Sequence, residues 1–406
     1  MEKLYKKLER YGQSDYYPFH MPGHKRRVRP APGLDCYAWD LTEIDGADEL
    51  FTADGIIAES EAQAGALFGA HTVYATGGST LCIQAMLHFS ALYAAAKGER
   101  PCILAARNTH KAFINAAALL DIDIQWCYPE TDTSYVSCHL SPEGIRQALH
   151  SCPQRVTAVY VTSPDYLGHM LDIRGIAEIC HQAGALLLVD NAHGAYLRFL
   201  PQSCHPMELG ADICCDSAHK TLGVLTGGAY LHISHAAPEW LAQQAKASMS
   251  LFGSSSPSYL ILQSLDAAND RMARFRDDLA DLLPKAAALK RRLSDRGYML
   301  TGEEPLKVTV CPKSFGYTGT EIAATLEENG AFPEFYDPDT VVFMLSPKNT
   351  DTELAKLKGA LADIKKRTAI TSTPPALPLC GEIMRPREAI FKENEDLPVE
   401  ECVGLI

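Results

Sequence analysis

The sequence has no excess of positive charge and no long basic block. Lysine and arginine number 37 against 50 aspartates and glutamates, which gives a formal net charge of −13. A surface that binds nucleic acid or an anionic membrane through its charge needs a basic patch, so we expect neither of these partners. The balance is compatible with a small cationic substrate.

Paired cysteines and long apolar stretches are also missing. The 13 cysteines are odd in number, scattered and never spaced as Cys-x-x-Cys, which indicates reduced thiols and no disulfide framework or zinc site. The N-terminus MEKLYKKLERYGQSDYY lacks the apolar core of a signal peptide, and no apolar run reaches membrane-spanning length. We therefore expect a cytoplasmic protein with no membrane contact and no metal.

Short apolar runs that end in polar residues dominate the first two thirds of the chain. Four of them are typical of buried strands: PCILAARN (101–108), TAVYVTSPD (157–165), ALLLVDNAHG (185–194) and ADICCDSAHK (211–220). Amphipathic segments such as IRGIAEICHQAG lie between some of them and predict helices, with Gly184 as a C-terminal cap. This alternation predicts an α/β fold with a mostly parallel sheet covered on both faces.

The order of these segments also predicts the domain organisation. A large domain is expected over residues 51–266, after an N-terminal arm over residues 1–50. A connecting helix and a small α/β domain follow over residues 267–370, since LKVTVCPKS, GTEIAATLEENG and TVVFMLSPKNT alternate strand and helix patterns. Residues 371–406 form a tail that is rich in proline at first.

The segment TGGST (76–80) stands between an apolar run and the helix pattern LCIQAMLHFSALYAAA. Glycines and hydroxyl residues at a helix N-terminus offer backbone N–H groups, side-chain donors and the positive end of the helix dipole to a phosphate. A plain turn with a Ser/Thr cap is the alternative. The glycine spacing differs from nucleotide-binding loops, so a smaller phosphate ester is favoured.

Two further strand ends carry a carboxylate and an amine. Asp190 ends the apolar run LLLVD, where an unpaired charge is costly, and Lys220 follows the run ADICCD. In a parallel sheet, ligands collect beyond the carboxyl ends of the strands. An aspartate and a lysine there, together with a phosphate loop, are what a pyridoxal 5′-phosphate site needs.

Other polar residues follow the same strand ends. His110 in RNTHK is a candidate for stacking on a flat cofactor, although a lone histidine is more often a surface or core residue. Ser217 and His219 precede Lys220 and can donate to a phosphate. Their presence argues against a merely solvated lysine.

Eight segments together resemble the bacterial Orn/Lys/Arg decarboxylases in their short form, over nearly the whole chain. These segments, in the order of the family, are FHMPGHK (19–25), DLTEIDGADEL (40–50), GST (78–80), RNTHKA (107–112), TSPDYLG (162–168), DNAHGAY (190–196), SAHKTL (217–222) and SSSPSY (254–259). The resemblance implies the aspartate aminotransferase fold, a homodimer or larger homo-oligomer with sites at the subunit interface, and a pyridoxal phosphate-dependent decarboxylase.

The resemblance also implies roles for individual residues. Lys220 becomes the Schiff-base lysine and Asp190 the partner of the pyridine nitrogen, while His110 stacks on the ring and His193 lies near it. Phosphate contacts fall to the residues of GST and SAHK, which are Gly78, Ser79, Thr80, Ser217 and His219. Ser255 or Ser256 is expected to reach the neighbouring subunit's cofactor, and His24 and Lys25 belong to an arm that completes a site.

The implied reaction is decarboxylation of arginine, lysine or ornithine in polyamine metabolism or acid response, with arginine favoured. Glu43, Asp45 and Asp48 are candidates for holding the substrate's distal cation, or they form a solvated acidic loop. Other cofactor-dependent reactions, such as aminotransfer or aldol-type cleavage, and a non-catalytic paralogue stay open.

The sequence departs from the family at several positions. It has TGGST where NGST is usual, and GVLTGG where PSLTQ commonly follows HKTL. Family members continue beyond REAIFKENEDLPVEECVGLI, so we interpret the tail as truncated. The departures leave the expected cofactor residues in place and bear on substrate choice.

Overall fold

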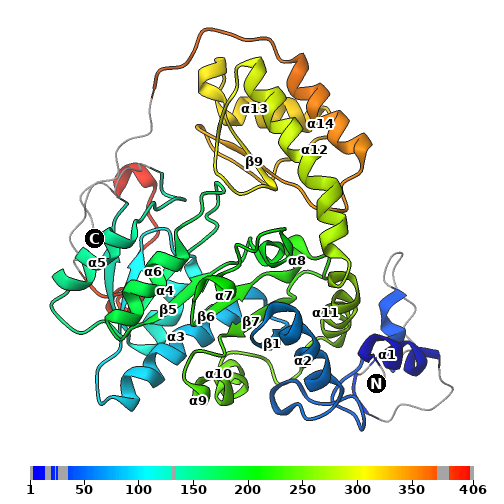
Figure 1. Ribbon diagram of the computed structural model, residues 1–406, viewed down its shortest axis with the longest axis vertical. Coiled ribbons are helices and arrows are strands. Elements are labelled where there is room, and N and C mark those ends of the chain that lie inside the picture. Colours follow the sequence, from blue (N-terminus) through cyan, green and yellow to red (C-terminus); the bar gives the residue numbers. More distant parts are fainter. Residues whose placement is uncertain are drawn as a thin grey trace.

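The computed structural model describes residues 3–13, 20–22, 24–25, 35–129, 134–372 and 384–402. Phe19 and Gly23 of the FHMPGHK segment and parts of the predicted tail lie outside these residues. The chain forms a large domain, a small domain joined to it by the long helix α12, and a C-terminal segment that returns to the large domain (Figure 1).

The large domain is built on a seven-stranded sheet with the order β1-β7-β6-β5-β4-β2-β3. Only β7 runs against its neighbours β1 and β6, and the other pairs are parallel. This confirms the predicted mostly parallel sheet. The strands are β1 (His71–Ala75), β2 (Cys102–Ala106), β3 (Asp123–Cys127), β4 (Ala158–Thr162), β5 (Leu186–Asp190), β6 (Ile213–Asp216) and β7 (Ala229–Ile233).

Helices cover both faces of this sheet, because its central strands are apolar on both sides. One face packs against α3, α4 and α10, and the other against α5 and α6. The helices of this domain are α2 (Ile56–Phe68), α3 (Gly78–Ala96), α4 (Lys111–Leu120), α5 (Pro142–Ser151), α6 (Ile173–Gln182), α7 (Pro206–Leu209), α8 (Ala218–Thr221), α9 (Glu239–Gln243), α10 (Ala245–Ser250) and α11 (Tyr259–Met272).

The local sequence accounts for where these helices begin and end. Asp172 accepts a hydrogen bond from the Gly175 N–H at the start of α6, and Gly184 beyond its end has a positive φ of 70°. Among the described residues, α3 alone is long and apolar enough to cross a membrane, and half of that stretch is buried in the fold. Helix α3 therefore packs as a core helix against one face of the large-domain sheet.

Helix α11 crosses the predicted domain boundary at residue 266. Helix α11 continues to Met272, and its buried residues Leu262 and Leu265 belong to the same apolar core as Ile57 of α2. Ala273 and Arg274 separate α11 from α12 (Phe275–Arg296), the helix that leads to the small domain. The apolar positions facing α2 keep α11 with the large domain.

The small domain has a four-stranded sheet with the order β10-β11-β9-β8, in which every pair is antiparallel. Its elements are β8 (Met299–Thr301), β9 (Lys307–Cys311), α13 (Gly319–Glu328), β10 (Phe335–Tyr336), β11 (Val341–Met344) and α14 (Asp351–Asp363). Capping boxes begin α13 at Thr318 and α14 at Thr350, as Thr-x-x-Glu sequences favour.

The two ends of the described chain both pack on the large domain. In the N-terminal helix α1 (Leu4–Gln13), the Tyr5 N–H donates to an Asp266 carboxylate oxygen of α11 at 3.1 Å. Near the C-terminus, Arg385 precedes α15 (Pro386–Phe391) and pairs with Asp121 at 2.9 Å, beside the end of α4. Short 3-10 helices complete the fold: η1 (Asp35–Ala38), η2 (Leu50–Thr52), η3 (Ala195–Phe199), η4 (Pro312–Phe315) and η5 (Val399–Glu401).

Candidate active site

A cavity of about 420 Å³ lies beyond the carboxyl ends of β2, β4 and β5, beside the start of α4. This is the edge of a parallel sheet at which ligands collect. Its lining combines cationic, aromatic and hydroxyl side chains with one carboxylate: Ser79, Arg107, Asn108, Thr109, His110, Lys111, Tyr135, Val136, Thr162, Pro164, Tyr166, Asp190, Ala192, His193 and Lys220.

Five of the nine predicted site residues line this cavity: Ser79, His110, Asp190, His193 and Lys220. The other four, Gly78, Thr80, Ser217 and His219, are not part of its wall but belong to the two segments that border it. The structure therefore brings together residues from four separate strand ends, over a sequence distance of more than a hundred residues.

Lys220 and His193 are in contact on the wall of the cavity. Lys220 lies in the short helix α8, and its Nζ is 2.7 Å from His193 Nε2. Burial lowers the pKa of Lys220, and the negative charges of Asp190 and Glu334 oppose that shift. Burial, with the nearby charges of Lys307 and Lys220, lowers the pKa of His193 well below its ordinary value. A neutral His193 therefore accepts a hydrogen bond from the Lys220 amine.

Asp190 is only 3% exposed at the end of β5. One of its carboxylate oxygens accepts a hydrogen bond from the Tyr160 hydroxyl at 3.1 Å, and the other from the Ala192 N–H at 3.1 Å. These two donors hold the carboxylate in one orientation on the cavity wall. No cation pairs with it among the described ion pairs, so a cationic ring nitrogen in the cavity would supply the compensating charge.

The TGGST segment forms the N-terminus of α3. Gly78 has a φ of 71°, which a side chain disfavours, and its N–H donates to the Gly227 carbonyl at 2.7 Å. The following N–H groups of the first helical turn have no partner within the helix. The Ser217 hydroxyl donates to Ser79 Oγ at 3.0 Å, which joins this turn to the start of α8. The arrangement suits a phosphate.

His110 is exposed and caps α4. Its Nδ1 accepts a hydrogen bond from the Ala112 N–H at 3.1 Å, so a neutral ring carries its proton on Nε2. The cap holds the imidazole at the cavity wall in a position to lie over a flat ligand. His219 is held differently, since its Nδ1 lies 3.0 Å from the Gly228 carbonyl oxygen.

Three buried polar atoms near the cavity have no hydrogen-bond partner within the described structure: Asn108 Oδ1, Thr162 Oγ1 and His193 Nδ1. Unpaired buried polar atoms are costly, and at a ligand site a bound molecule commonly completes them. These features together fit pyridoxal phosphate. The Asp190 carboxylate suits its ring nitrogen, the Lys220 amine suits its aldehyde, and the turn at Gly78 and Ser79 suits its phosphate.

The acidic loop DLTEIDGADEL does not contribute to this cavity within one chain. Both oxygens of Asp48 accept backbone hydrogen bonds, from the N–H groups of Glu49 and Asp54 and from those of Gly55 and Ile57 at the start of α2. Burial would raise the pKa of Asp48, but these backbone donors lower it overall. Asp48 is therefore a structural acceptor, and neither Glu43 nor Asp45 lines the cavity.

Sequence reasoning missed several residues around the cavity. Tyr166 and Thr162 are in the segment TSPDYLG, whose place after a strand could have marked them. Lys307 and Glu334 come from the small domain, and no local pattern distinguishes them from surface charges. Lys307 is buried, and its Nζ donates to the Asp165 carbonyl at 2.6 Å.

A buried cluster supports the strand that leads into Ser217. Asp216 accepts hydrogen bonds from His205 Nε2 at 2.9 Å, His232 Nε2 at 3.1 Å and Asn191 Nδ2 at 2.6 Å. The Met207 N–H donates to His205 Nδ1, so the proton of a neutral His205 is on Nε2. Such a proton occupies the position that a metal would need, which favours a hydrogen-bonded cluster over a metal site.

Replacing Asp216 with alanine is expected to lower the free energy of unfolding by about 3 kcal/mol, because three buried donors lose their acceptor. Urea denaturation of the cofactor-free protein measures this change, and Asp295→Ala, at an exposed position of α12, is the matched control. Dialysis against a chelator should leave the wild-type midpoint unchanged. A drop in that midpoint would contradict the hydrogen-bonded assignment.

Comparison with known proteins places the chain among decarboxylases of basic amino acids. Residues 2–311 match the family model described as Orn/Lys/Arg decarboxylase, major domain. An arginine decarboxylase of Bacillus subtilis (strain 168) is 28% identical over 99% of this chain and 86% of its own length. An arginine decarboxylase of Halalkalibacterium halodurans is 29% identical over 95% of this chain and 83% of its own length.

Solved structures share the fold at lower identity. Lysine decarboxylase A from Pseudomonas aeruginosa superposes with a TM-score of 0.75 at 18% identity, over 89% of this chain. This chain spans 59% of the length of that protein. A serine palmitoyltransferase of Sphingomonas wittichii superposes with a TM-score of 0.59 at 16% identity, over 74% of each chain. These likenesses confirm the predicted α/β fold class.

Proposed function

Because the chain belongs to the Orn/Lys/Arg decarboxylase family, we propose that it decarboxylates arginine, lysine or ornithine in the cavity around Lys220, with arginine favoured. Family membership confirms the predicted enzyme class and its pyridoxal phosphate dependence. The observation that carries the assignment to this cavity is the partly buried Lys220 amine, 2.7 Å from His193 in the cavity that Asp190 also lines.

The chain's own residues would hold the cofactor at three points. When bound, pyridoxal phosphate supplies an aldehyde that bonds to amines and a cationic ring that withdraws electrons from the substrate's α-carbon. Asp190 would keep the ring nitrogen protonated, and the turn at Gly78 and Ser79 would bind the phosphate. His110 would cover one face of the ring.

Lys220 and His193 are the two groups that would transfer a proton to the substrate's α-carbon. Burial favours the neutral form of the Lys220 amine, which is the nucleophilic form. His193 Nε2 accepts from that amine, and Lys220 or His193 would supply the proton that takes the place of CO₂ on the substrate's α-carbon.

The assembly is a further proposal. We infer a cytoplasmic homodimer, or a larger homo-oligomer, in which the segment SSSPSY contributes to the neighbouring site. In support, Ser255 and Ser256 are exposed in the loop between α10 and α11, and Leu251 nearby is 61% exposed.

The purified enzyme, loaded with pyridoxal phosphate, is expected to convert at least one of arginine, lysine and ornithine to its amine with release of CO₂. Mass spectrometry of the products and a CO₂ assay, with each amino acid supplied separately, measure this conversion. Appearance of a keto acid or an aldehyde would indicate aminotransfer or aldol-type cleavage. Failure to convert all three would overturn the proposal.

A further inference from the structure

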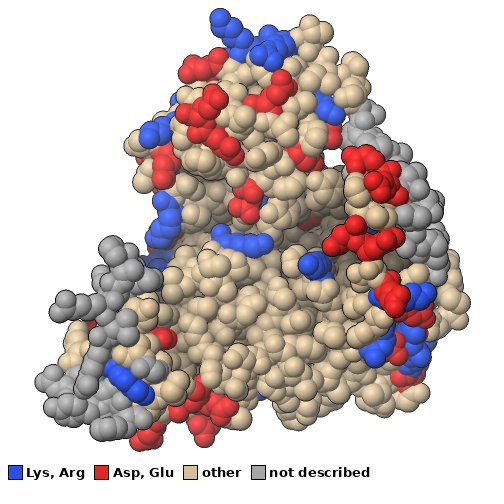
Figure 2. All heavy atoms as spheres, turned by 180° about the vertical axis from the view of Figure 1, so that it is seen from behind, with Lys and Arg blue, Asp and Glu red and all other residues tan. Residues whose placement is uncertain are grey.

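A buried lysine of the small domain contacts a turn that forms part of the active-site cavity. Lys307 in β9 is only 3% exposed, whereas Figure 2 shows other lysine and arginine side chains on the outer surface of that domain. Its Nζ donates hydrogen bonds to the carbonyl groups of Asp165 at 2.6 Å and Tyr166 at 3.3 Å. These carbonyls belong to the turn Asp165–Gly168, and the Tyr166 side chain lines the cavity. Lys307 therefore joins β9 to the wall of the site.

Two further donors of the small domain support the same turn. Thr309 lies two residues after Lys307, on the same face of β9, and its hydroxyl donates to the Leu167 carbonyl at 2.7 Å. The Glu304 N–H donates to the Gly168 carbonyl at 2.9 Å. Four successive carbonyl groups of the turn therefore accept hydrogen bonds from one short segment of the small domain. Such a set of bonds holds the turn in one conformation.

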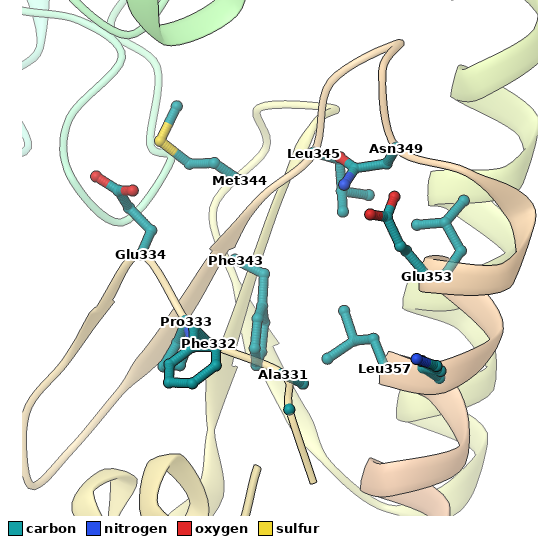
Figure 3. A pocket seen from close by; sticks show the side chains of 13 residues that line it. Ala331, Phe332, Pro333, Glu334, Phe343, Met344, Leu345, Asn349, Glu353 and Leu357 are labelled. Atoms are coloured by element: carbon teal, nitrogen blue, oxygen red, sulfur yellow. The ribbon is translucent and has the colours of Figure 1, made fainter. Parts of the chain in front are cut away.

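This contact is separate from the pocket that the small domain forms by itself. That pocket, of about 440 Å³, lies between β11 and α14 and does not include Lys307 (Figure 3). Glu334 lies at its edge, with a carboxylate that points away from it and accepts a hydrogen bond from the Tyr166 hydroxyl at 3.3 Å. The small domain therefore contacts Tyr166 both at its main chain and at its hydroxyl.

The Tyr166 ring contacts both Lys307 and His193. Its centroid is 5.6 Å from Lys307 Nζ, and the ring packs edge-on against the His193 ring at a centroid distance of 5.0 Å. His193 is 7% exposed, and its Nε2 lies 2.7 Å from the Lys220 amine. A displacement of the turn would therefore uncover the histidine that contacts Lys220.

The surroundings of His193 favour its neutral form. Burial is the largest cause that lowers the pKa of His193, and the nearby cationic groups lower it further. Lys307 has the largest effect among these groups, before Lys220, His110 and His219. A change at the turn would reduce the burial, and loss of the Lys307 amine would also remove a charge, so both changes act on the pKa of His193 in the same direction.

The groups that face Lys307 favour its charged form against the effect of burial. Burial lowers the pKa of Lys307, and the Lys220 charge acts in the same direction. Three carboxylates oppose this shift: Glu304, Asp165 and Glu334. The two carbonyl acceptors of the turn also stabilise an ammonium group, which has three hydrogens to donate. The buried cation is therefore held where it contacts the turn.

We propose that Lys307 is a positioning residue that holds the Tyr166 turn in place and thereby keeps His193 covered and in contact with Lys220. The inference rests on the proposed function, because it takes His193 and Lys220 as the pair that transfers the proton. Lys307 does not itself line the cavity, so it acts through Tyr166. The small domain then affects proton transfer without touching the reacting atoms.

The test measures His193 itself in the cofactor-free protein. Lys307→Met keeps a long side chain but removes the donors and the charge, so the pKa of His193 is expected to rise by about one unit. Deuterium exchange of the imidazole C2 hydrogen over a pH series, followed by peptide mass spectrometry, measures this pKa. Lys290→Met is the matched control, because Lys290 is a partly buried lysine that donates to the Glu304 carbonyl at 2.7 Å. It should change the pKa of His193 by less than about 0.2 units.

Activity of the cofactor-loaded enzyme gives a second readout. In Lys307→Met, kcat is expected to fall about 10- to 100-fold while KM changes less than about threefold, because the turn supports proton transfer more than substrate binding. A higher pKa protonates His193 at a higher pH, and a protonated His193 cannot accept from Lys220. The acid limb of the kcat profile should therefore move to higher pH, and Lys290→Met should keep the wild-type profile.

A second variant covers the case in which Lys307→Met does not fold, as the loss of a cooperative urea transition would show. Thr309→Val keeps the shape of the side chain and removes only the hydrogen bond to the Leu167 carbonyl. It should also raise the pKa of His193, by a smaller amount, because the turn is less firmly held and His193 is less completely buried.

Two results would overturn the inference. One is an unchanged pKa of His193 in folded Lys307→Met, or in Thr309→Val if Lys307→Met does not fold. The other is an equal rise in Lys290→Met, which would indicate a general loosening of the domain junction. The pKa is measured without cofactor or turnover. A rise specific to the turn therefore supports the inference even if the wild-type enzyme converts none of the three amino acids and the proposed function fails.

Discussion

Lys220→Ala is expected to abolish decarboxylation, with kcat at least about a thousandfold below wild type. The substitution removes both the amine proposed to bond to the cofactor aldehyde and the donor that lies 2.7 Å from His193 Nε2. The fold should survive, because Lys220 lies in a four-residue helix and makes no bond to the apolar core. Steady-state assays of CO₂ release on the cofactor-loaded variant measure the loss.

Chemical labelling separates the proposed covalent role of Lys220 from general damage to the site. Borohydride reduction of the cofactor-loaded wild type should fix pyridoxal phosphate to the peptide that contains Lys220, as peptide mass spectrometry would show. Lys97→Ala, at an exposed position after α3, is the control and should keep both the adduct and the activity. An adduct on Lys111, which lines the same cavity, would reassign the covalent lysine.

The second large effect is expected from Asp190→Asn, which should lower kcat by about 100- to 1,000-fold. An amide cannot keep the ring nitrogen protonated, so the cofactor withdraws electrons less strongly from the α-carbon. The amide oxygen can still accept from the Tyr160 hydroxyl or the Ala192 N–H, so most of the local hydrogen bonding persists. Assays at saturating cofactor and substrate measure the change in kcat.

Stability of the cofactor-free protein provides the control for Asp190→Asn. The neutral amide removes the desolvation cost of a buried charge but leaves one of the two donors, the Tyr160 hydroxyl or the Ala192 N–H, without its acceptor, so the two effects oppose each other and the unfolding midpoint should change little. Lower activity together with undiminished stability would support the electronic role. Activity near that of wild type would place the partner of the ring nitrogen elsewhere.

The parts of the site that could be predicted from sequence are the strand ends. The runs ending at Asp190 and Asp216 are apolar and short, and the residues that follow them are polar. In a parallel sheet the carboxyl ends of the strands meet at one edge, so His110, Asp190 and Lys220 could be expected close together before any coordinates were known. Local chemistry and sheet geometry are sufficient for that conclusion.

Other features depended on contacts between distant segments. The acidic loop around Asp48 has the composition of a cation-binding site. The Asp48 carboxylate, however, accepts hydrogen bonds from backbone N–H groups at the start of α2. The pattern of residues cannot reveal this, because a capping role depends on how the loop folds back. The continuation of α11 beyond residue 266 likewise depends on which core its apolar face joins.

The sequence by itself determined the fold class, the family and the strand-end residues that meet in one cavity, because these depend on hydrophobic periodicity and on motifs that are local in the chain. Only the tertiary structure decided that Glu334 and Lys307 approach Tyr166 from the other domain. Neither residue is in a motif, and more than a hundred residues separate each from Tyr166. Their position depends on how the small domain packs against the large one, and no local sequence pattern encodes that arrangement.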